Sequence, residues 1–253
     1  MYNSSDLTIV IPTYSEKDSV ANLIRDLKLT LLSTDDMSFR LLFVDDSPDD
    51  STVAAIEAVA MRTSEPRLRI DYVHRPLKDQ DGLAGAVIYG IRQATTDLVV
   101  VMDGDGQHPP KTITSMMEAI RTSEMDVVVA SRYCRGGSAE GLANPVRHVI
   151  SRLSTWAAKA MFPNATRGIS DPLTGFFLLR VQSIDLDLLS QAAGFKVLLE
   201  LLVQHPRLRK TQVPLQFAAR NDGVSKGTVT QGWIYLRQLI RLRFTPVSLK
   251  ESH

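Results

Sequence analysis

The sequence predicts an α/β fold in which a mainly parallel central sheet is flanked by helices. Short runs dense in Val, Ile and Leu alternate with longer stretches that place apolar residues at helical spacing, and the connections between them are short. The chain has 253 residues, of which 44% are hydrophobic, so it can bury one sizeable core as one large domain or two small ones.

The expected elements occupy the first half of the chain. Five apolar runs are expected to be buried strands: Leu7–Ile11, Phe39–Val44, Arg67–Val73, Leu98–Met102 and Asp126–Ala130. Four stretches between them are expected to be helices: Asp18–Leu32, Thr52–Arg62, Leu83–Gln93 and Thr112–Arg121. The alternation fades after residue 131, where glycines and prolines become frequent. We therefore expect residues 1–131 to form a nucleotide-binding half and the remainder to supply substrate loops and supporting elements.

Composition excludes several classes of protein. The formal net charge is +1, so the chain has no global attraction for nucleic acid, and no nucleic-acid partner is expected. Cys134 is the single cysteine, which rules out an internal disulfide and is compatible with the cytosol. The first residues lack the pattern of a secretory signal, and no long apolar run is present. We expect a soluble or peripheral protein.

Polar clusters follow three of the predicted strands, at the sheet edge where open α/β sheets bind ligands. The first strand leads into Pro-Thr-Tyr-Ser-Glu (residues 12–16), the second into Asp-Asp-Ser-Pro-Asp-Asp (45–50) and the fourth into Asp-Gly-Asp-Gly-Gln-His-Pro-Pro (103–110). Strand termination and helix capping would explain one such cluster. Three at one edge favour a binding site. The first turn lacks the glycines of a dinucleotide site, so no nicotinamide or flavin is expected.

The third cluster suits a divalent metal ion. Asp103 and Asp105 stand one residue apart just past a buried strand, and both can face a hard cation in an irregular turn. Mg²⁺ or Mn²⁺ prefers oxygen ligands and would bridge a diphosphate, and Gln107 could add a carbonyl oxygen. Such an ion neutralises the charge that grows on a nucleoside-diphosphate leaving group. Gly104 and Gly106 are expected to let the backbone approach the ligand.

In their order, these motifs resemble the inverting family 2 glycosyltransferases, specifically the polyprenyl-phosphate mannosyltransferases (dolichol-phosphate mannose synthases). The resemblance covers about residues 7–245. It is carried by residues 12–16, 44–46, 103–110, 131–137 (Ser-Arg-Tyr-Cys-Arg-Gly-Gly), 147–152, 171–176 (Asp-Pro-Leu-Thr-Gly-Phe) and 194–196 with Glu200, and by Arg220 and 225–227.

The resemblance implies a GT-A fold, a nucleotide-sugar donor and a single metal ion. By likeness, the donor side comprises Pro12, Tyr14, Glu16 and Asp45 around the nucleoside, together with Asp103, Arg220 and Lys226. The metal ligands would be Asp103, Asp105 and Gln107. The acceptor phosphate would meet Arg132, Arg147 and Thr174, and catalysis would rest on Asp105, Arg132, Arg147 and Asp171. A phosphate in apolar surroundings does require always-charged donors such as Arg. Asp171 has the alternative role of capping the turn at Pro172.

The implied reaction transfers a hexose with inversion onto a polyprenyl phosphate, with mannose from GDP-mannose as the leading donor. Two departures from the family pattern weaken this choice of donor. Residues 44–52 lack the usual Asn and Gly, and residues 78–85 depart from Lys-x-Gly-x-Gly. A UDP-sugar such as UDP-glucose is therefore an alternative. A more distant one is a haloacid-dehalogenase-like phosphatase, which also places Asp-x-Asp after a strand, with the first Asp as nucleophile.

The expected organisation is a catalytic domain over residues 1–227 and a C-terminal amphipathic segment over residues 228–253. The segment is expected to lie at the membrane interface, on the cytoplasmic face, making the protein peripheral; packing on the catalytic core is the alternative. Some relatives carry membrane helices after this point, so a membrane-anchoring subunit or further membrane helices are compatible with the sequence. The expected apolar side consists of Trp233, Leu236, Leu239, Ile240 and Phe244, with Arg237 and Arg241 facing anionic headgroups.

Two further residues receive structural interpretations. Trp156 lies in an apolar helical stretch and is expected in the core, and His108 is expected to pack the loop rather than to bind the metal.

Overall fold

The computed structural model describes residues 6–33, 37–141, 145–189, 196–218 and 229–244. The strands in this part of the chain are β1 (Leu7–Thr13), β2 (Phe39–Asp45), β3 (Leu68–His74), β4 (Leu98–Val101), β5 (Val127–Ser131), β6 (Phe177–Arg180) and β7 (Lys210–Pro214). They form one sheet in the order β3-β2-β1-β4-β6-β5-β7. β6 runs antiparallel to both of its neighbours, and the other pairings are parallel. The predicted mainly parallel sheet is confirmed.

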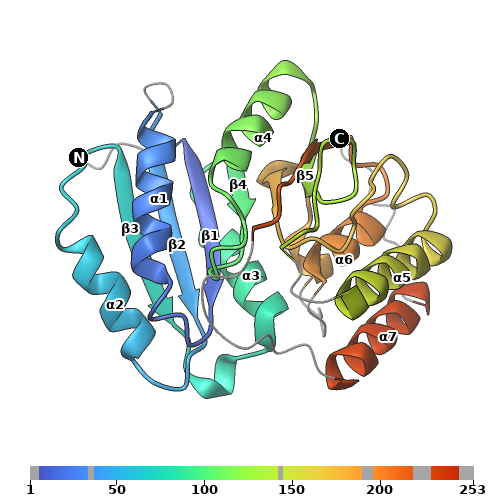
Figure 1. The fold of residues 1–253 in the computed structure, drawn as a ribbon, viewed down its shortest axis with the longest axis horizontal. Coiled ribbons are helices and arrows are strands. Elements are labelled where there is room, and N and C mark those ends of the chain that lie inside the picture. Colours follow the sequence, from blue (N-terminus) through green and yellow to red (C-terminus); the bar gives the residue numbers. More distant parts are fainter. Residues whose placement is uncertain (1–5, 34–36, 142–144, 190–195, 219–228, 245–253) are drawn as a thin grey trace.

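Helices cover both faces of the sheet (Figure 1). One hydrophobic cluster joins the sheet to α1 (Val20–Leu32), α2 (Ser51–Ala60) and α4 (Lys111–Thr122). A second cluster, on the opposite face, joins it to α3 (Gly82–Arg92), α5 (Pro145–Met161), α6 (Val197–Gln204) and α7 (Val229–Phe244). Short 3₁₀ turns complete the described elements: η1 (Leu77–Asp79), η2 (Val181–Ser183) and η3 (Leu186–Leu189).

The central strands are apolar without alternation because both of their faces are covered. Every residue of β1 is buried. Val10 packs into the cluster of α3, whereas Ile9 and Ile11 pack into the cluster of α1. Such continuous Val and Ile runs are typical of parallel strands buried on both sides.

All nine predicted elements are present, with bounds that differ from the predicted ones by at most two residues. The later elements β6, β7, α5 and α6 were not predicted individually. β6 is a four-residue strand that returns through the sheet between β4 and β5. A run this short carries too little periodicity to be recognised among glycines and prolines.

The topology brings the polar clusters to one edge of the sheet. The strands β3, β2, β1 and β4 are adjacent and parallel, so their carboxyl ends lie side by side. Residues 171–176 reach the same edge because they lead into antiparallel β6, whose first residue, Phe177, pairs with Val101 at the end of β4. The polar clusters after β1, β2 and β4 and residues 171–176 therefore lie at the same edge of the sheet.

The exposure of side chains on α5 and α7 differs from what the sequence predicted. Trp156 of α5 is 70% exposed, so its predicted core position is wrong. The buried residues of α5 include the small Thr155 and Ala158, while its large apolar side chains face outward. α7 lies beside α5 (Figure 1), and its Tyr235 hydroxyl donates to the Ser154 carbonyl at 2.7 Å.

One side of α7 packs on the core, as in the alternative interpretation of the sequence. Leu239, expected on the outer apolar side, is only 2% exposed and belongs to this inner side. The outer side carries Trp233, Leu236, Ile240 and Phe244, all exposed. None of the helices in the described ranges has the length and apolar character required to span a bilayer.

Candidate active site

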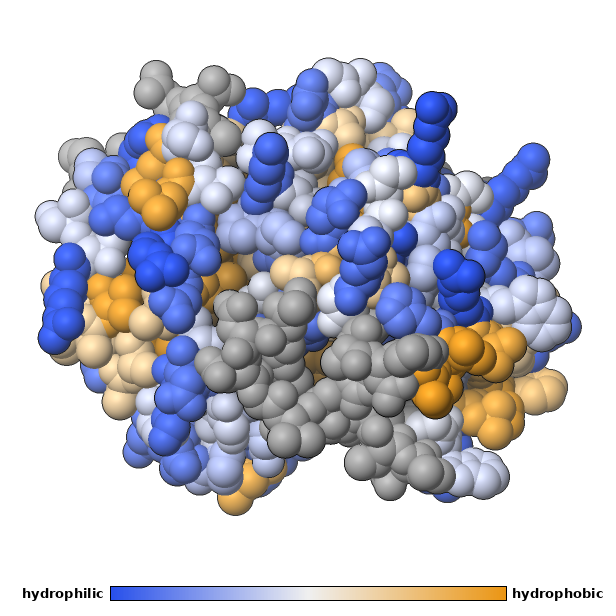
Figure 2. All heavy atoms as spheres, in the orientation of Figure 1, coloured by the Kyte–Doolittle hydropathy of each residue, from blue (hydrophilic) through white to orange (hydrophobic). Residues whose placement is uncertain are grey.

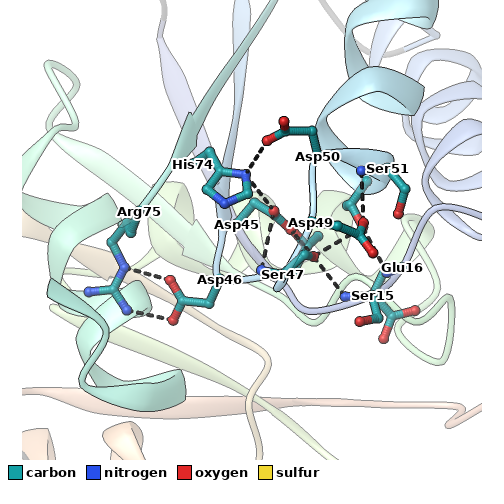
Figure 3. Close-up of polar contacts among 12 residues, drawn as sticks. Ser15, Glu16, Asp45, Asp46, Ser47, Asp49, Asp50, Ser51, His74 and Arg75 are labelled. Atoms are coloured by element: carbon teal, nitrogen blue, oxygen red, sulfur yellow. Dashed lines mark hydrogen bonds and ion pairs between the residues drawn. The ribbon is translucent and has the colours of Figure 1, made fainter. Parts of the chain in front are cut away.

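The first carboxylate after β2 is enclosed by the protein (Figure 3). Asp45 is fully buried, and its Oδ1 accepts hydrogen bonds from the hydroxyls of Thr13 at 2.8 Å and Ser47 at 2.7 Å. Its Oδ2 accepts from the Ser47 N–H at 3.3 Å and lies 3.4 Å from His74 Nδ1. A buried carboxylate needs such partners. In this structure the Asp45 carboxylate contacts Thr13 and Ser47, and its expected contact with a nucleoside stays a prediction.

The second carboxylate of this motif forms a buried ion pair. Asp46 accepts two hydrogen bonds from Arg75, from Nε at 2.8 Å and from Nη2 at 2.6 Å. The Arg75 guanidinium also donates to Asp81 at 2.8 Å, just before α3. Figure 3 shows this bidentate pairing beside the Asp45 cluster. The sequence analysis missed Arg75, although it directly follows β3 and extends the strand-end pattern to a fourth strand.

The turn after β1 is held in a left-handed conformation. Ser15 has φ +57°, and its N–H donates to Ser47 Oγ at 2.8 Å. A non-glycine residue rarely adopts this conformation without such support. The turn leaves Tyr14 half-exposed at the edge, whereas Pro12 is buried. Of the expected nucleoside contacts, Tyr14 and the partly exposed Glu16 are thus the accessible ones.

His108 organises the turn that carries the acidic pair. Its Nδ1 accepts the Asp103 backbone N–H at 3.0 Å, and its ring stacks on Phe176 with centroids 4.7 Å apart. Burial lowers the pKa of the His108 imidazole to about 4, so the ring stays neutral and able to accept. The predicted loop-packing role of His108 is confirmed. A Cβ on Gly104 would lie 2.9 Å from the Thr13 side chain, so this glycine lets the turn approach β1. Its expected role toward a ligand stays a prediction.

The acidic pair fits a hard divalent cation. Asp103 and Asp105 supply carboxylate oxygens at the end of β4, and Gly175 leaves room beside Asp103, whose carboxylate would lie 3.0 Å from a Cβ there. The described residues contain no group of three or more His, Cys, Asp or Glu side chains that could hold a metal. Mg²⁺ and similar ions are commonly bound by one or two carboxylates plus substrate phosphates and water, so two carboxylates suffice. When bound, the ion would neutralise charge on a leaving diphosphate.

Gln107 ties this turn to a distant segment. Its side-chain amide donates to the carbonyls of Ala218 at 3.2 Å and Gly141 at 3.4 Å, and its own carbonyl accepts the Ala218 N–H at 3.1 Å. Its N–H donates to Asp105 at 3.0 Å. The main-chain carbonyl of Gln107 is thus hydrogen-bonded to Ala218, and metal ligation by a carbonyl oxygen of Gln107 stays a prediction.

On the other side of the site, Arg132 and Asp171 form a bidentate ion pair. The guanidinium donates to the carboxylate at 2.7 Å from Nε and at 3.0 Å from Nη2. Asp171 is fully buried, and the Arg132 side chain is 11% exposed. Burial opposes the charge on Arg132, but the Asp171 carboxylate holds its pKa above the usual value. Asp171 therefore orients Arg132 in this structure, in place of the turn-capping role considered above.

Of the remaining predicted residues, only Thr174 has a described side chain. Thr174 is buried, and its hydroxyl oxygen accepts the Phe176 N–H at 3.2 Å in the loop before β6. Arg147 lies in α5, but its side chain is outside the described part, as are Arg220 and Lys226. Their assigned roles stay predictions.

Lys196 joins the site although the sequence analysis gave it no role. It immediately precedes α6, and burial lowers the pKa of its ammonium to about 8. Its charge interacts with Arg132, Asp103 and Asp171, the two carboxylates favouring the protonated form. Lys196 thus lies in the electrostatic field of both sides of the site. Its place in the Gly-Phe-Lys motif was the available signal.

A cavity of about 790 Å³ opens beside Arg132. Its cationic lining adds Arg152 and Lys159 of α5, and its aromatic lining includes Tyr133 and Trp156. Such a combination of fixed positive charge with apolar rings suits an anionic group attached to an apolar chain.

Comparison with known proteins identifies the family. The model of the family described as Glycosyl transferase family 2 matches residues 8–186, more than half of the chain. The chain therefore belongs to glycosyl transferase family 2, and its sheet and helices form a GT-A fold. The phosphatase alternative is excluded, in agreement with the position of the Asp-x-Asp motif after β4.

Two curated relatives extend across nearly the whole chain. A dolichol-phosphate mannosyltransferase of Pyrococcus furiosus is 31% identical over 239 residues, covering 93% of this chain and 63% of the relative. A protein of the same name from Saccharomyces cerevisiae is 29% identical over 248 residues, covering 94% of this chain and 87% of the relative. The chain thus spans less than two thirds of the Pyrococcus protein.

Solved structures share the fold at lower identity. Glucosyl-3-phosphoglycerate synthase from Mycobacterium tuberculosis in complex with UDP has a TM-score of 0.68 at 18% identity, covering 96% of this chain and 81% of that one. The complex of that enzyme with Mn²⁺, UDP and glucosyl-3-phosphoglycerate has a TM-score of 0.66 at 18% identity, covering 94% and 80%. At this identity the likeness concerns the fold.

Proposed function

We propose that this glycosyltransferase transfers mannose from GDP-mannose, with inversion, onto a polyprenyl phosphate at a membrane surface. The observation that carries the proposal is the buried Arg132–Asp171 pair beside the α5 cavity, across the sheet edge from the acidic pair. In a direct displacement the acceptor oxygen must lie beside the anomeric carbon of the donor. The donor and acceptor sites must therefore adjoin each other at one edge of the sheet. The names of the curated relatives support mannose and a lipid-linked acceptor.

The acceptor needs little activation by the protein. A lipid phosphate is already an anion at neutral pH, so its oxygen can attack the anomeric carbon directly while the nucleoside diphosphate leaves. Asp171 is committed to Arg132 and need not act as a base. Catalysis would then rest on positioning and on charge stabilisation. A Mg²⁺ or Mn²⁺ ion held by Asp103 and Asp105 would supply charge neutralisation on the donor side.

The exposed apolar side chains of α5 and α7 support an acceptor that stays in a bilayer while its phosphate reaches the site. Apolar surface gathers over α5 and α7, toward the lower right of Figure 2. On α5, Val149, Ile150 and Leu153 are 57–61% exposed, and α7 adds its own exposed apolar side. Neither helix contains an acidic residue. Because the charged residues of both helices are all basic, their apolar surface suits anionic headgroups, and the α5 cavity opens from the same helix.

A donor screen tests the proposal. Purified protein is supplied with GDP-mannose, UDP-glucose or UDP-N-acetylglucosamine, a polyprenyl phosphate in liposomes, and Mn²⁺ or Mg²⁺. We expect transfer of mannose from GDP-mannose. Transfer only from a UDP-sugar would replace the donor assignment, and transfer to no lipid phosphate would contradict the acceptor assignment.

Separate titrations test the acceptor arginines. In Arg147→Ala, affinity for the lipid phosphate should fall roughly tenfold or more, the value of a charged hydrogen bond, while affinity for the nucleotide is retained. Loss of nucleotide binding alone would move Arg147 to the donor side. Arg132→Lys is the better probe at the second position, because Arg132→Ala would strand the buried Asp171.

A further inference from the structure

One aromatic side chain, Phe217, contacts residues from both sides of the site. The Arg132 guanidinium lies over its ring, 5.4 Å from the ring centroid. The His108 ring meets it edge-on, with centroids 5.8 Å apart and planes at 61°. Arg132 is the predicted contact of the acceptor phosphate, and His108 accepts the Asp103 N–H in the turn of the acidic pair. A single ring therefore connects the acceptor side with the donor side.

Hydrogen bonds of the main chain fix the position of this ring. The Phe217 N–H donates to the Ser138 carbonyl at 3.0 Å, and its carbonyl accepts the Gly141 N–H at 3.1 Å. The next residue, Ala218, is hydrogen-bonded through its N–H and its carbonyl to Gln107 in the turn of the acidic pair. The segment is thus attached both to the loop after β5 and to the turn after β4, and such a network holds it in one arrangement.

The contact with Phe217 matters for Arg132 because Asp171 binds only one edge of its guanidinium. The carboxylate accepts from Nε and Nη2, while Nη1 has no hydrogen bond to any residue that the structure describes. Two bonds along one edge leave the guanidinium plane free to tilt about that edge. The rings of Tyr133 and Phe217, whose centroids lie 5.3 and 5.4 Å from the guanidinium carbon, restrict this tilt. Nη1 is then presented in one direction.

We propose that Phe217 is a positioning residue shared by the two sides: its ring orients Arg132 for the acceptor phosphate and supports His108 behind the acidic pair. This inference rests on the proposed function, which brings the acceptor to Arg132 and the metal ion to the acidic pair. Attraction between a cation and a ring face, and edge-to-face contact between rings, both require an aromatic side chain. An aliphatic side chain of similar size would fill the space without either interaction.

Two titrations without turnover test the two contacts. Calorimetry records the affinity of wild type and Phe217→Leu for a short polyprenyl phosphate in detergent and, separately, for GDP with Mn²⁺. We expect the lipid-phosphate affinity to fall roughly twofold to thirtyfold, the range of a cation–π contact. The GDP affinity should fall roughly twofold to tenfold, the range of an aromatic pair. Wild-type binding with either affinity unchanged in Phe217→Leu would overturn the inference alone. Wild type that binds neither ligand would overturn the proposed function and this inference together.

Two control variants separate positioning from packing. Phe217→Tyr keeps the ring and should retain both affinities. Phe39→Leu removes a ring from the hydrophobic cluster that Phe217 packs against, but at the first residue of β2, the end opposite to the site. Because Phe39 is only 2% exposed, this variant should lose at least as much thermal stability as Phe217→Leu while both affinities are retained. Equal weakening of binding in Phe217→Leu and either control would contradict a positioning role.

Double mutants assign each effect to one neighbour. If Phe217 acts through Arg132, Phe217→Leu should weaken lipid-phosphate binding less in an Arg132→Lys background than in wild type, because lysine lacks the planar group that stacks. If it acts through His108, Phe217→Leu should likewise weaken GDP binding less in a His108→Asn background. Additive losses in either cycle would overturn the shared role. Should Phe217→Leu fail to fold, Phe217→Met takes its place, since its flexible side chain also lacks a ring, and additive losses there would count equally against the proposal.

Discussion

At the carboxyl ends of β1 and β2, polar side chains are engaged with one another, whereas on α5 and α7 large apolar side chains face outward. Asp45 has all its described contacts within the donor side, to Thr13, Ser47 and His74. On the acceptor side, by contrast, Trp156 and Leu153 are 70% and 61% exposed. The side chains of the donor side are fixed by one another. The outer side of α5 and α7 is apolar and exposed, and we propose the bilayer as its partner.

Under the proposed function, this difference would let one fold serve a soluble donor and a lipid-bound acceptor. A small polar ligand is selected by fixed hydrogen-bond partners, which require an internally satisfied network. A lipid chain is instead held by apolar contact that has no direction. Changes on the donor side should therefore affect chemistry and stability, and changes on the outer helices should affect partitioning between water and membrane.

The largest effect is expected at the acidic pair. Asp105→Ala should reduce transfer roughly a hundredfold or more, because stabilisation of charge by a bound metal is worth several kcal/mol. Thermal unfolding should change little. The matched control is Asp97→Asn, an exposed aspartate at the opposite end of β4. Normal transfer by Asp105→Ala in excess Mn²⁺ would remove Asp105 from the metal site.

Breaking the buried ion pair should cost stability. Asp171→Asn leaves the Arg132 charge without its carboxylate and should lower the free energy of unfolding by about 3–5 kcal/mol. Urea denaturation measures this loss. Glu124→Gln removes the exposed end of another arginine pair, with Arg209 at 2.8 Å, and should cost about 1 kcal/mol or less. Similar losses in the two variants would show that the Arg132 pair is not enclosed as described.

Acid should weaken, through His108, the turn that carries Asp103 and Asp105. Its pKa is about 4 in the folded protein, below the ordinary value of 6.5, so between these values the unfolded chain binds the extra proton. Stability therefore falls as pH decreases from 6.5 to about 4 and is unaffected by this group outside that window, with a total of roughly 3 kcal/mol. His108→Asn retains an acceptor but does not titrate. In metal-free protein, the difference in unfolding free energy between wild type and variant should change with pH between about 4 and 6.5 and stay constant outside that window.

A substitution on the outer side of α5 is expected to have the smallest effect on folding but a clear effect on binding to liposomes. Leu153→Glu should leave the unfolding free energy nearly unchanged but weaken flotation with anionic liposomes roughly tenfold, the value of burying one large apolar side chain. Leu29→Glu is the control, because Leu29 is similarly exposed, at 68%, but lies on α1. Equal flotation of the two variants would place the membrane contact elsewhere. Deleting α7 is a poorer test, since its inner side belongs to the core.

The sequence alone was sufficient for five of the seven described strands, for the first four helices and for the edge that holds the site. These follow from local information: an apolar run of strand length, a helical period, and polar residues where each strand ends. Asp103 and Asp105 could be placed because they follow β4 closely, whereas Arg132, which directly follows β5, was assigned to the acceptor phosphate through the family resemblance. The end of the preceding strand fixes where such residues lie.

Only the tertiary structure decided which side chains face the site and which face the protein. Asp45 and Asp46 are adjacent in sequence, yet one is enclosed by Thr13 and Ser47 and the other pairs with Arg75, 29 residues away. The periodicity of α5 defines an apolar stripe but not its direction, and the helix packs through small Thr155 and Ala158, leaving Trp156 outside. The hydrogen bond from Gln107 to the Ala218 carbonyl joins residues 111 positions apart. Contacts of this kind depend on how elements pack, which no local pattern encodes.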